Sequence, residues 1–450
     1  MRNFPYVTVS FDAQLNAFKI TQYSLNIKMA DLHSHLFLVI FATDINFIVV
    51  FFRKITVICA FITAIALFAQ NNLCADSVEA SLLICSPGHN VYELEGHAGL
   101  RLRNRAAGYD VAVNYGLFDF NSPNFIYRFV KGKTDYMVGV CNYSDFVSLY
   151  LEDGRYVAEW PLNLDAAQSQ RLLELVKENL RPENRVYRYN YLWDNCSTRP
   201  LAIVEMAVGD SIFFTGPNFS CEWSFRNVMQ HYHRRYPWYQ FGIDLALGSG
   251  IDRPITDRQK IFAPVLLNEM MPDAYFYNSH KKLSVNESAV MHRPVEIYNP
   301  DDSRPMPVSP VVFGVSVLAF ALAVSVSDLR KKSVSRWADA IIMGLYGTVG
   351  CVIAFLVFVS THEATSPNWL LLWLNPACLI VPVCIYIKRA ASFVLKYEIV
   401  NFVALIALAV AWPWLGQQGN PAFIPLILAD VILSARYIYL SQCIKKATVI

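Results

Sequence analysis

The sequence has few charged residues. Asp, Glu, Lys and Arg make up 16% of its 450 residues, whereas 54% of the residues are hydrophobic. In a soluble globular chain about 25% of the residues are charged, so this composition argues against a wholly soluble protein. The shortage is uneven, because residues 76–305 have the mixed polarity of a soluble domain and residues 311–441 are dominated by long apolar runs. The first of these regions is long enough to bury a core of its own.

Motifs for metal and nucleic-acid binding are also missing. The ten cysteines include no C-x-x-C pair, which argues against a zinc site or a thioredoxin-type redox site. No basic stripe or nucleic-acid-binding motif occurs. We therefore expect no metal, no cofactor and no nucleic-acid partner. Spacing leaves open whether the cysteines of the soluble region form disulfides; these are Cys85, Cys141, Cys196 and Cys221.

An export signal precedes the soluble region. Two basic residues open the segment 53–75, an apolar run follows, and a small residue, Ala75, ends it. This order is typical of a secretory signal, so we expect a signal peptide, or an anchor if the segment is not cleaved. Residues 1–52 do not fit in front of such a signal, and we interpret them as an over-extended start of the reading frame.

The C-terminal third predicts a transmembrane domain, residues 306–445, that follows a proline-rich linker. A spanning helix needs about 20 apolar residues, and we expect five such helices. The first and third loops between them are basic, whereas the second and fourth carry no Lys or Arg. Basic loops face the cytoplasm, which places the soluble domain outside, on the other face of the membrane. The apolar runs lie at about 311–327, 340–360, 369–387, 400–415 and 423–440.

Within the last apolar run, two charged residues need partners. Asp430 and Arg436 are six residues apart, which does not place them on one helix face. Intramembrane charges are costly and face a partner or a cavity, but we expect no ion pair between these two.

The soluble region predicts an α+β domain. Helical spacing and a capping Asp165 predict a helix over 165–180, and a second helix is expected from Cys196 to about Val208. Alternation of apolar and polar residues predicts the strands of an antiparallel sheet, near 81–86, 94–102, 109–115, 136–141, 156–160 and 186–191.

One cysteine and one histidine of this domain suggest thiol chemistry. Cys196 lies where a predicted strand meets a predicted helix, and His97 lies within another predicted strand. A helix N-terminus favours the thiolate, and a histidine on the adjacent sheet can accept the proton. Backbone N–H groups from Asn195 to Ser197 would stabilise an oxyanion.

The residues alone leave alternatives open. Either Asn114 or Asp119 would orient the imidazole, and the sequence does not choose between them. Lone cysteines and strand histidines are more often structural than catalytic. Four further histidines of the exported region compete with His97 as the base: His89, His231, His233 and His280.

Several motifs strengthen the catalytic interpretation by resemblance. A histidine on a strand comes first in this chain, and an Asn-Cys pair at the start of a helix follows. This order is similar to that in circularly permuted papain-like enzymes of the NlpC-like superfamily, which include the lecithin:retinol acyltransferase group. Residues 78–445 more closely resemble the Lnb family of bacterial lipoprotein N-acyltransferases. The matching elements are Gly96–Arg101, Asn114–Gly116, Asp194–Arg199, Asp252–Gln259 and Thr361–Trp369, which runs into Leu374–Pro376.

The resemblance implies a circularly permuted papain-like thiol domain followed by an all-α transmembrane bundle. Cys196 would be the acyl-carrying nucleophile and His97 its base. The Asp252–Gln259 run would be structural or line the substrate, and His362 would line the acyl site at the lipid headgroups. The resemblance adds oxyanion or substrate residues: Asn195, Ser197, Arg199, Arg101, Asp252 and Arg253.

The function expected from this resemblance is lipoprotein N-acylation. An acyl chain would pass from a membrane phospholipid, through a Cys196 thioester, to the α-amino group of a diacylated lipoprotein. Two alternatives remain. One is a membrane-anchored peptidoglycan amidase or endopeptidase of the same fold, which has little use for five helices. The other is a non-catalytic membrane scaffold.

Overall fold

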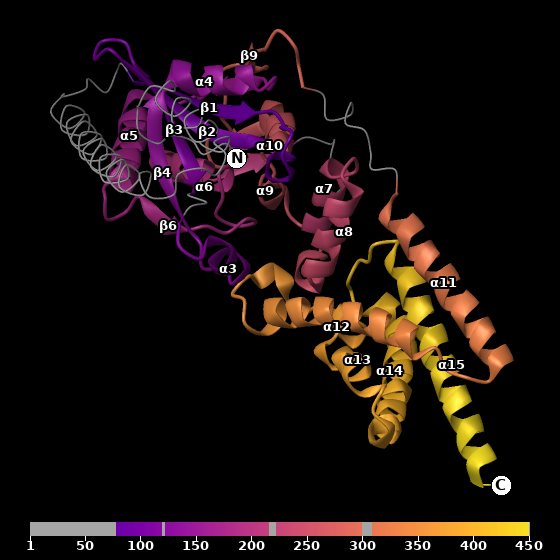
Figure 1. The fold of residues 1–450 in the computed structure, drawn as a ribbon. Helices are drawn as coiled ribbons and strands as arrows, with labels where there is room; N and C mark the ends of the chain where they lie inside the picture. The colour runs from indigo at the N-terminus through magenta and orange to yellow at the C-terminus, as the bar shows by residue number, and fades with distance from the viewer. Residues whose placement is uncertain (1–77, 119–121, 216–221, 299–307, 450) are drawn as a thin grey trace, which may run out of the picture.

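The computed structural model describes residues 78–118, 122–215, 222–298 and 308–449. It has a sheet-rich N-terminal domain and a C-terminal helical region (Figure 1). Several expectations fall outside the described residues: the start 1–52, the leader 53–75, the linker, Asp119 and Cys221.

In the described part of the chain, the core of the N-terminal domain is a seven-stranded antiparallel sheet. Its order is β6-β4-β3-β2-β1-β5-β9. Strands were expected in six of these places, and the structure confirms each, although β6 is shorter than predicted. The strands are β1 (Val78–Cys85), β2 (His97–Asn104), β3 (Tyr109–Leu117), β4 (Asp135–Asn142), β5 (Val157–Pro161), β6 (Val186–Arg188) and β9 (Val290–His292).

Both faces of the sheet are covered by helices. Leu82 and Leu100 point into the larger core, beneath α5 (Ala166–Leu180), α6 (Thr198–Val208) and α10 (Pro264–Met270). Leu83 points to the opposite face and packs with Phe146 of α4 (Tyr143–Glu152). Strand alternation thus sends neighbouring residues into two cores. Complete burial of each leucine is worth roughly 1.5–3 kcal/mol.

The remaining elements of this domain extend the core toward the helical region. Asp165 caps α5 as predicted, since its side chain accepts a hydrogen bond from the Gln168 N–H. The short strands β7 (Ile212–Phe214) and β8 (Ala274–Phe276) pair with each other. The other helices are α3 (Phe125–Val130), α7 (Phe225–Tyr232), α8 (Pro237–Ala246) and α9 (Asp257–Lys260).

Among the described residues, four helices are long and apolar enough to cross a membrane. All four coincide with expected spans. The helices at the first and fourth expected runs, 311–327 and 400–415, extend beyond the apolar residues. The helices are α11 (Pro310–Lys331), α12 (Arg336–Phe358), α14 (Ala391–Ala411) and α15 (Phe423–Val449).

The third expected span, residues 369–387, does not form one long helix. This segment forms two 3₁₀ turns, η8 (Trp369–Leu372) and η9 (Pro376–Leu379), and one short helix, α13 (Ile380–Cys384). Pro376 and Pro382 explain the breaks, because proline lacks the N–H that a helix needs and disfavours helix in the preceding residue.

Contacts between the two parts of the chain fix their orientation. The Ser249 N–H donates to the Pro367 carbonyl at 2.8 Å, and the Gln418 N–H donates to Asp252 at 3.1 Å. The loops that carry Pro367 and Gln418 are the two without Lys or Arg. Both therefore lie on the side of the soluble domain. Because α14 returns from the basic loop at Lys388 to that side, we expect residues 369–387 to cross the membrane as well, without forming one long helix.

One arginine anchors this contact region. Arg226 of α7 is fully buried, and it pairs with Asp244 at 2.9 Å and with Asp252 at 2.6 Å. Its Nη2 also donates to the Leu247 carbonyl. Asp244 and Asp252 in turn accept hydrogen bonds from the membrane loop that carries Gln418. The guanidinium thus holds together the carboxylates on which the helical region is docked.

The intramembrane charges find partners on other helices. Arg436 of α15 pairs with Asp328 of α11 and with Asp339 of α12. Asp430 accepts a hydrogen bond from Asn401 of α14 at 2.9 Å. As expected, the two charges of α15 do not pair with each other. The spacing within one helix could not reveal these partners, since they lie on helices that are distant in sequence.

Replacing the anchor is predicted to destabilise the whole protein. Arg226→Met leaves two buried carboxylates uncompensated, which should cost about 3–5 kcal/mol. We expect a lower thermal unfolding midpoint for the detergent-solubilised full chain. Arg253→Met, at the exposed arginine next to Asp252, is the control and should leave the midpoint unchanged. Equal midpoints for both variants would contradict the anchoring role.

Candidate active site

Cys196 is held in a rigid turn just before α6. The Asn195 side chain accepts hydrogen bonds from the Ser197 and Thr198 N–H groups, at 2.8 and 2.9 Å. In return, Thr198 Oγ1 accepts from the Asn195 N–H at 2.8 Å. The helix begins at Thr198, with Ser197 as its N-cap. Cys196 therefore lies just before the helix and is not its first residue. It stands at the predicted junction between a strand and a helix.

The turn places the thiol at one end of the sheet. The Sγ atom of Cys196 is within hydrogen-bonding reach of the Ala98 N–H, which directly follows His97 in β2, and of the Tyr189 hydroxyl. Gly116 of β3 passes close by, with a positive φ of 85°, and a Cβ there would lie 3.5 Å from Cys196 Cβ. A larger residue at this position would crowd the thiol and strain the backbone.

His97 is oriented by the next strand. Its Nε2 lies 2.7 Å from Asn114 Oδ1, and both residues are buried. Since an amide oxygen only accepts hydrogen bonds, Nε2 carries the proton and the lone pair lies on Nδ1. That tautomer suits Nδ1 to act as a base. Of the two candidate orienters, Asn114 therefore makes the required contact, and Asp119 lies outside the described residues.

Burial keeps both reactive groups neutral. It raises the pKa of the Cys196 thiol to about 11, against hydrogen bonds that favour the thiolate. It lowers the pKa of His97 to about 4, against the hydrogen bond to Asn114. Desolvation of the buried sulfur thus opposes the thiolate that a helix N-terminus favours. With a neutral thiol and a neutral imidazole, nucleophilic attack by the sulfur would require proton transfer.

Most of the expected oxyanion donors are already engaged. The Asn195 and Ser197 N–H groups donate within the turn, and the Ser197 hydroxyl donates to the Ile261 carbonyl at 2.5 Å. The Ala98 N–H, the Cys196 N–H and the Tyr189 hydroxyl are within hydrogen-bonding reach of the sulfur. Alternation in the segment 186–191 predicted a strand but not which tyrosine faces Cys196, so Tyr189 was not predicted.

The expected substrate arginines are paired within the domain. Arg101 binds Glu159 at 2.8 Å and Asp110 at 2.5 Å. Arg199 pairs with Asp194, next to the turn, and its guanidinium stacks 3.6 Å from the centre of the Tyr187 ring. Both arginines therefore support local structure, Arg199 directly beside the turn of Cys196.

The remaining expected site residues lie at the membrane side. Asp252 is part of the Arg226 contact region, and Arg253 beside it is exposed. His362 lies in the loop after α12, and its Nε2 is 2.8 Å from the Phe129 carbonyl at the end of α3. Asp252 and His362 join the two parts of the chain, and no described interaction connects these three residues with Cys196.

The competing histidines occupy other environments. His233 is buried, with Nδ1 2.9 Å from Gln240 and Nε2 3.5 Å from Glu95. His89 packs 3.7 Å from Tyr298, between ring centroids. His231 packs on Trp223, and His280 on Phe213. Cys85, Cys141 and Cys196 are free thiols. The catalytic roles of Cys196 and His97, and the expectations of no metal and no cofactor, stay predictions.

Comparison with known families matches most of the chain. Residues 67–222 match the Lnb N-terminal periplasmic domain, and residues 302–446 match the Lnb transmembrane domain. No curated protein and no solved structure matches the chain. The two family matches cover the candidate site and the docked helices. Together with the four spanning helices, they make the chain a multi-pass inner-membrane protein with a periplasmic domain.

The acidity of Cys196 can be tested by alkylation. At pH 7 the buried thiol should react slowly with iodoacetamide, and its rate should rise about tenfold per pH unit toward pH 11, because the thiolate fraction grows in that way. Peptide mass spectrometry separates this reaction from that of the exposed Cys351. A rate that does not change between pH 6 and 9 would indicate a thiolate–imidazolium pair instead.

The orientation of His97 predicts two effects at Asn114. Asn114→Ala removes the acceptor that fixes the tautomer, and turnover should fall about tenfold to a hundredfold. Asn114→Asp keeps an acceptor but adds a negative charge, which raises the pKa of His97. The acid limb of the pH–rate profile should then move upward from near pH 4. An unchanged acid limb in Asn114→Asp would exclude His97 as the base.

Proposed function

The chain belongs to the Lnb family, and on that premise we propose that it is a lipoprotein N-acyltransferase. It moves an acyl chain from a membrane phospholipid to the α-amino group of a diacylated lipoprotein. Cys196 carries the acyl chain as a thioester, and His97 transfers the protons. Catalysis requires no metal and no cofactor. The observation that carries this proposal is the His97–Asn114 pair at 2.7 Å beside the turn of Cys196.

The fold of the periplasmic domain follows from the same premise. We propose a circularly permuted papain-like domain, in which the strand with His97 precedes the helix that follows Cys196. The antiparallel sheet and the packing of α6 against β2 support this. A circular permutation changes the order of the elements along the chain but keeps their arrangement in space. The thiol would therefore still meet a histidine and its amide partner at one end of the sheet.

In the first half-reaction, the thiol attacks the phospholipid ester. As the S–C bond forms, Nδ1 of His97 takes the proton from Sγ. The oxyanion accepts hydrogen bonds from the Cys196 N–H and from Tyr189. Collapse of the intermediate breaks the ester C–O bond, and the imidazolium returns the proton to the leaving alkoxide. The products are an acylated Cys196 and a lysophospholipid.

In the second half-reaction, an amine replaces the sulfur. The neutral α-amino group of the diacylated lipoprotein attacks the thioester carbonyl, and His97 accepts one proton from the nitrogen. The C–S bond then breaks, the amide is released, and the proton returns to sulfur. The starting state of the enzyme is restored, with the thiol and the imidazole both neutral.

The membrane helices would keep the site close to its lipid substrates. The periplasmic domain contacts both loops on the periplasmic side of the helical region, and α3 lies next to α12 (Figure 1). Phospholipid and lipoprotein both reside in that membrane. Water is scarce at a buried thiol, which disfavours hydrolysis of the thioester. A cell-wall amidase would gain nothing from this arrangement.

The proposal is tested in cells that depend on this protein for lipoprotein N-acylation. Cys196→Ala should abolish the third acyl chain, measured by mass spectrometry of lipoprotein N-termini, because the nucleophile is gone. Cys141→Ala, at a half-buried thiol of β4 in the same domain, should leave triacylation intact. Triacylated lipoproteins in cells that contain only Cys196→Ala would refute the proposal.

A further inference from the structure

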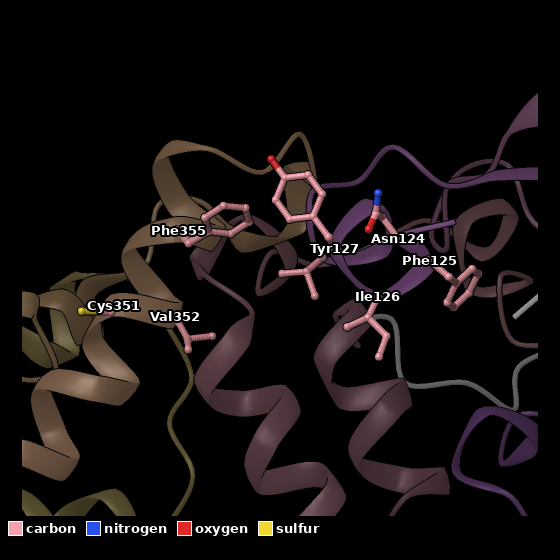
Figure 2. A pocket seen from close by; sticks show the side chains of 8 residues that line it. Asn124, Phe125, Ile126, Tyr127, Cys351, Val352 and Phe355 are labelled. Atoms are coloured by element: carbon pink, nitrogen blue, oxygen red, sulfur yellow. The ribbon is translucent and has the colours of Figure 1, made fainter. Parts of the chain in front are cut away.

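An apolar groove lies where the periplasmic domain meets the membrane helices. It has a volume of about 800 Å³, within the roughly 300–1,000 Å³ typical of ligand sites. Figure 2 shows its two walls, one from α3 and one from α12. Phe125, Ile126 and Tyr127 come from α3, and Cys351, Val352 and Phe355 come from α12.

One wall of the groove belongs to a helix that is long and apolar enough to cross a membrane. Cys351 lies seven residues before the end of α12 at Phe358, which is about 10 Å along the helix axis. Ile126 is 77% exposed and Val352 is 53% exposed. Large exposed apolar patches mark binding or membrane sites, and an apolar surface on a spanning helix would face acyl chains rather than water.

The two walls are held together by the loop after α12. Thr361 Oγ1 donates to the Gly132 carbonyl at 3.0 Å, and the Thr361 N–H donates to the Lys131 carbonyl at 3.0 Å. His362 adds its contact with the Phe129 carbonyl. Each of these carbonyls belongs to the C-terminal end of α3 or to the turn after it. The expected site residue His362 thus shapes the groove, although it is distant from the thiol.

A continuous series of aromatic rings joins the groove to Cys196. Phe125 stacks on Phe118, which contacts Tyr136 at 5.0 Å, and Tyr136 stacks on Tyr189 at 4.1 Å between centroids. The Tyr189 hydroxyl reaches the sulfur of Cys196. Phe125, Phe118 and Tyr189 are only half-buried, so part of each ring remains open to an acyl chain along this series.

The positive charge beside the groove favours lipids with anionic headgroups. Residues 124–133 contain Arg128, Lys131 and Lys133 and no acidic residue. Arg128 and Arg188 share a single carboxylate, that of Asp135, so cationic charge is in excess. Basic segments at this height attract anionic lipid phosphates. They repel the positively charged α-amino group of a lipoprotein.

We propose that the groove between α3 and α12 holds the acyl chain of the phospholipid donor, with its phosphate at the basic end of α3 and its ester directed along the aromatic series to Cys196. This rests on the proposed function for the reaction at Cys196, but not for lipid binding itself. The acceptor lipoprotein approaches the thioester from elsewhere.

Lipid binding is tested without chemistry by photocrosslinking. The full-length Cys196→Ala protein is placed in nanodiscs that contain a phosphatidylglycerol with a diazirine in one acyl chain. After irradiation, we expect labelled peptides from residues 125–130 and 351–355, and competition by unlabelled phospholipid. Labelling spread evenly over the lipid-facing helices, with no enrichment in these two segments, would overturn the proposal.

The role in catalysis is tested by filling the groove. Val352→Trp should slow acylation of Cys196 by labelled phospholipid at least about tenfold, and Ile126→Trp fills the same space from the opposite wall. Val403→Trp is the matched control, since Val403 is 60% exposed on α14 and away from the groove. It should acylate at close to the wild-type rate.

The rates of the two half-reactions in these variants distinguish a donor site from an acceptor site. Slower acylation with normal transfer to a diacylated lipopeptide supports the groove as the donor site. Normal acylation with slower transfer would assign the groove to the acceptor and overturn the proposal. If the wild-type protein never acylates Cys196, the proposed function fails, and the crosslinks alone decide whether the groove binds phospholipid.

Discussion

The docking of the periplasmic domain on the membrane loops determines where every other feature lies. Arg226 is buried between Asp244 and Asp252, and the loop with Gln418 binds the same two carboxylates. A buried charge without a partner is costly, so this contact has one low-energy geometry. Because of it, the thiol site and the groove keep fixed positions relative to the membrane surface.

Burial has opposite effects on structure and on reactivity at the thiol. The same packing that fixes the Asn195 turn removes water from Cys196 and His97, and both then favour their neutral forms. A permanent thiolate would be open to reaction with other electrophiles. In the proposed mechanism, the neutral pair would become reactive only when an ester carbonyl lies next to the sulfur and proton transfer accompanies attack.

The sequence predicted the parts that depend on local pattern. Alternation identified the strands that carry His97 and Asn114, Asp165 was recognised as a helix cap, and the positive-inside rule gave the topology that the loop contacts support. Features set by distant residues were not predictable. The partners of Arg436 lie on other helices, and nothing local distinguishes Tyr189 from its neighbours. Desolvation at Cys196 likewise depends on the whole fold, whereas the helix dipole that we expected to lower its pKa is a local effect.

The most direct test of the central claim is the mass of the acyl-enzyme. Purified full-length protein incubated with phospholipid, without an acceptor, should gain the mass of one acyl chain on the peptide that contains Cys196. Neutral hydroxylamine should remove it, because a thioester is more labile than an ester or an amide. An acyl chain on a different residue, or an unmodified Cys196 peptide in a protein that still acylates lipoproteins, would contradict the thioester mechanism.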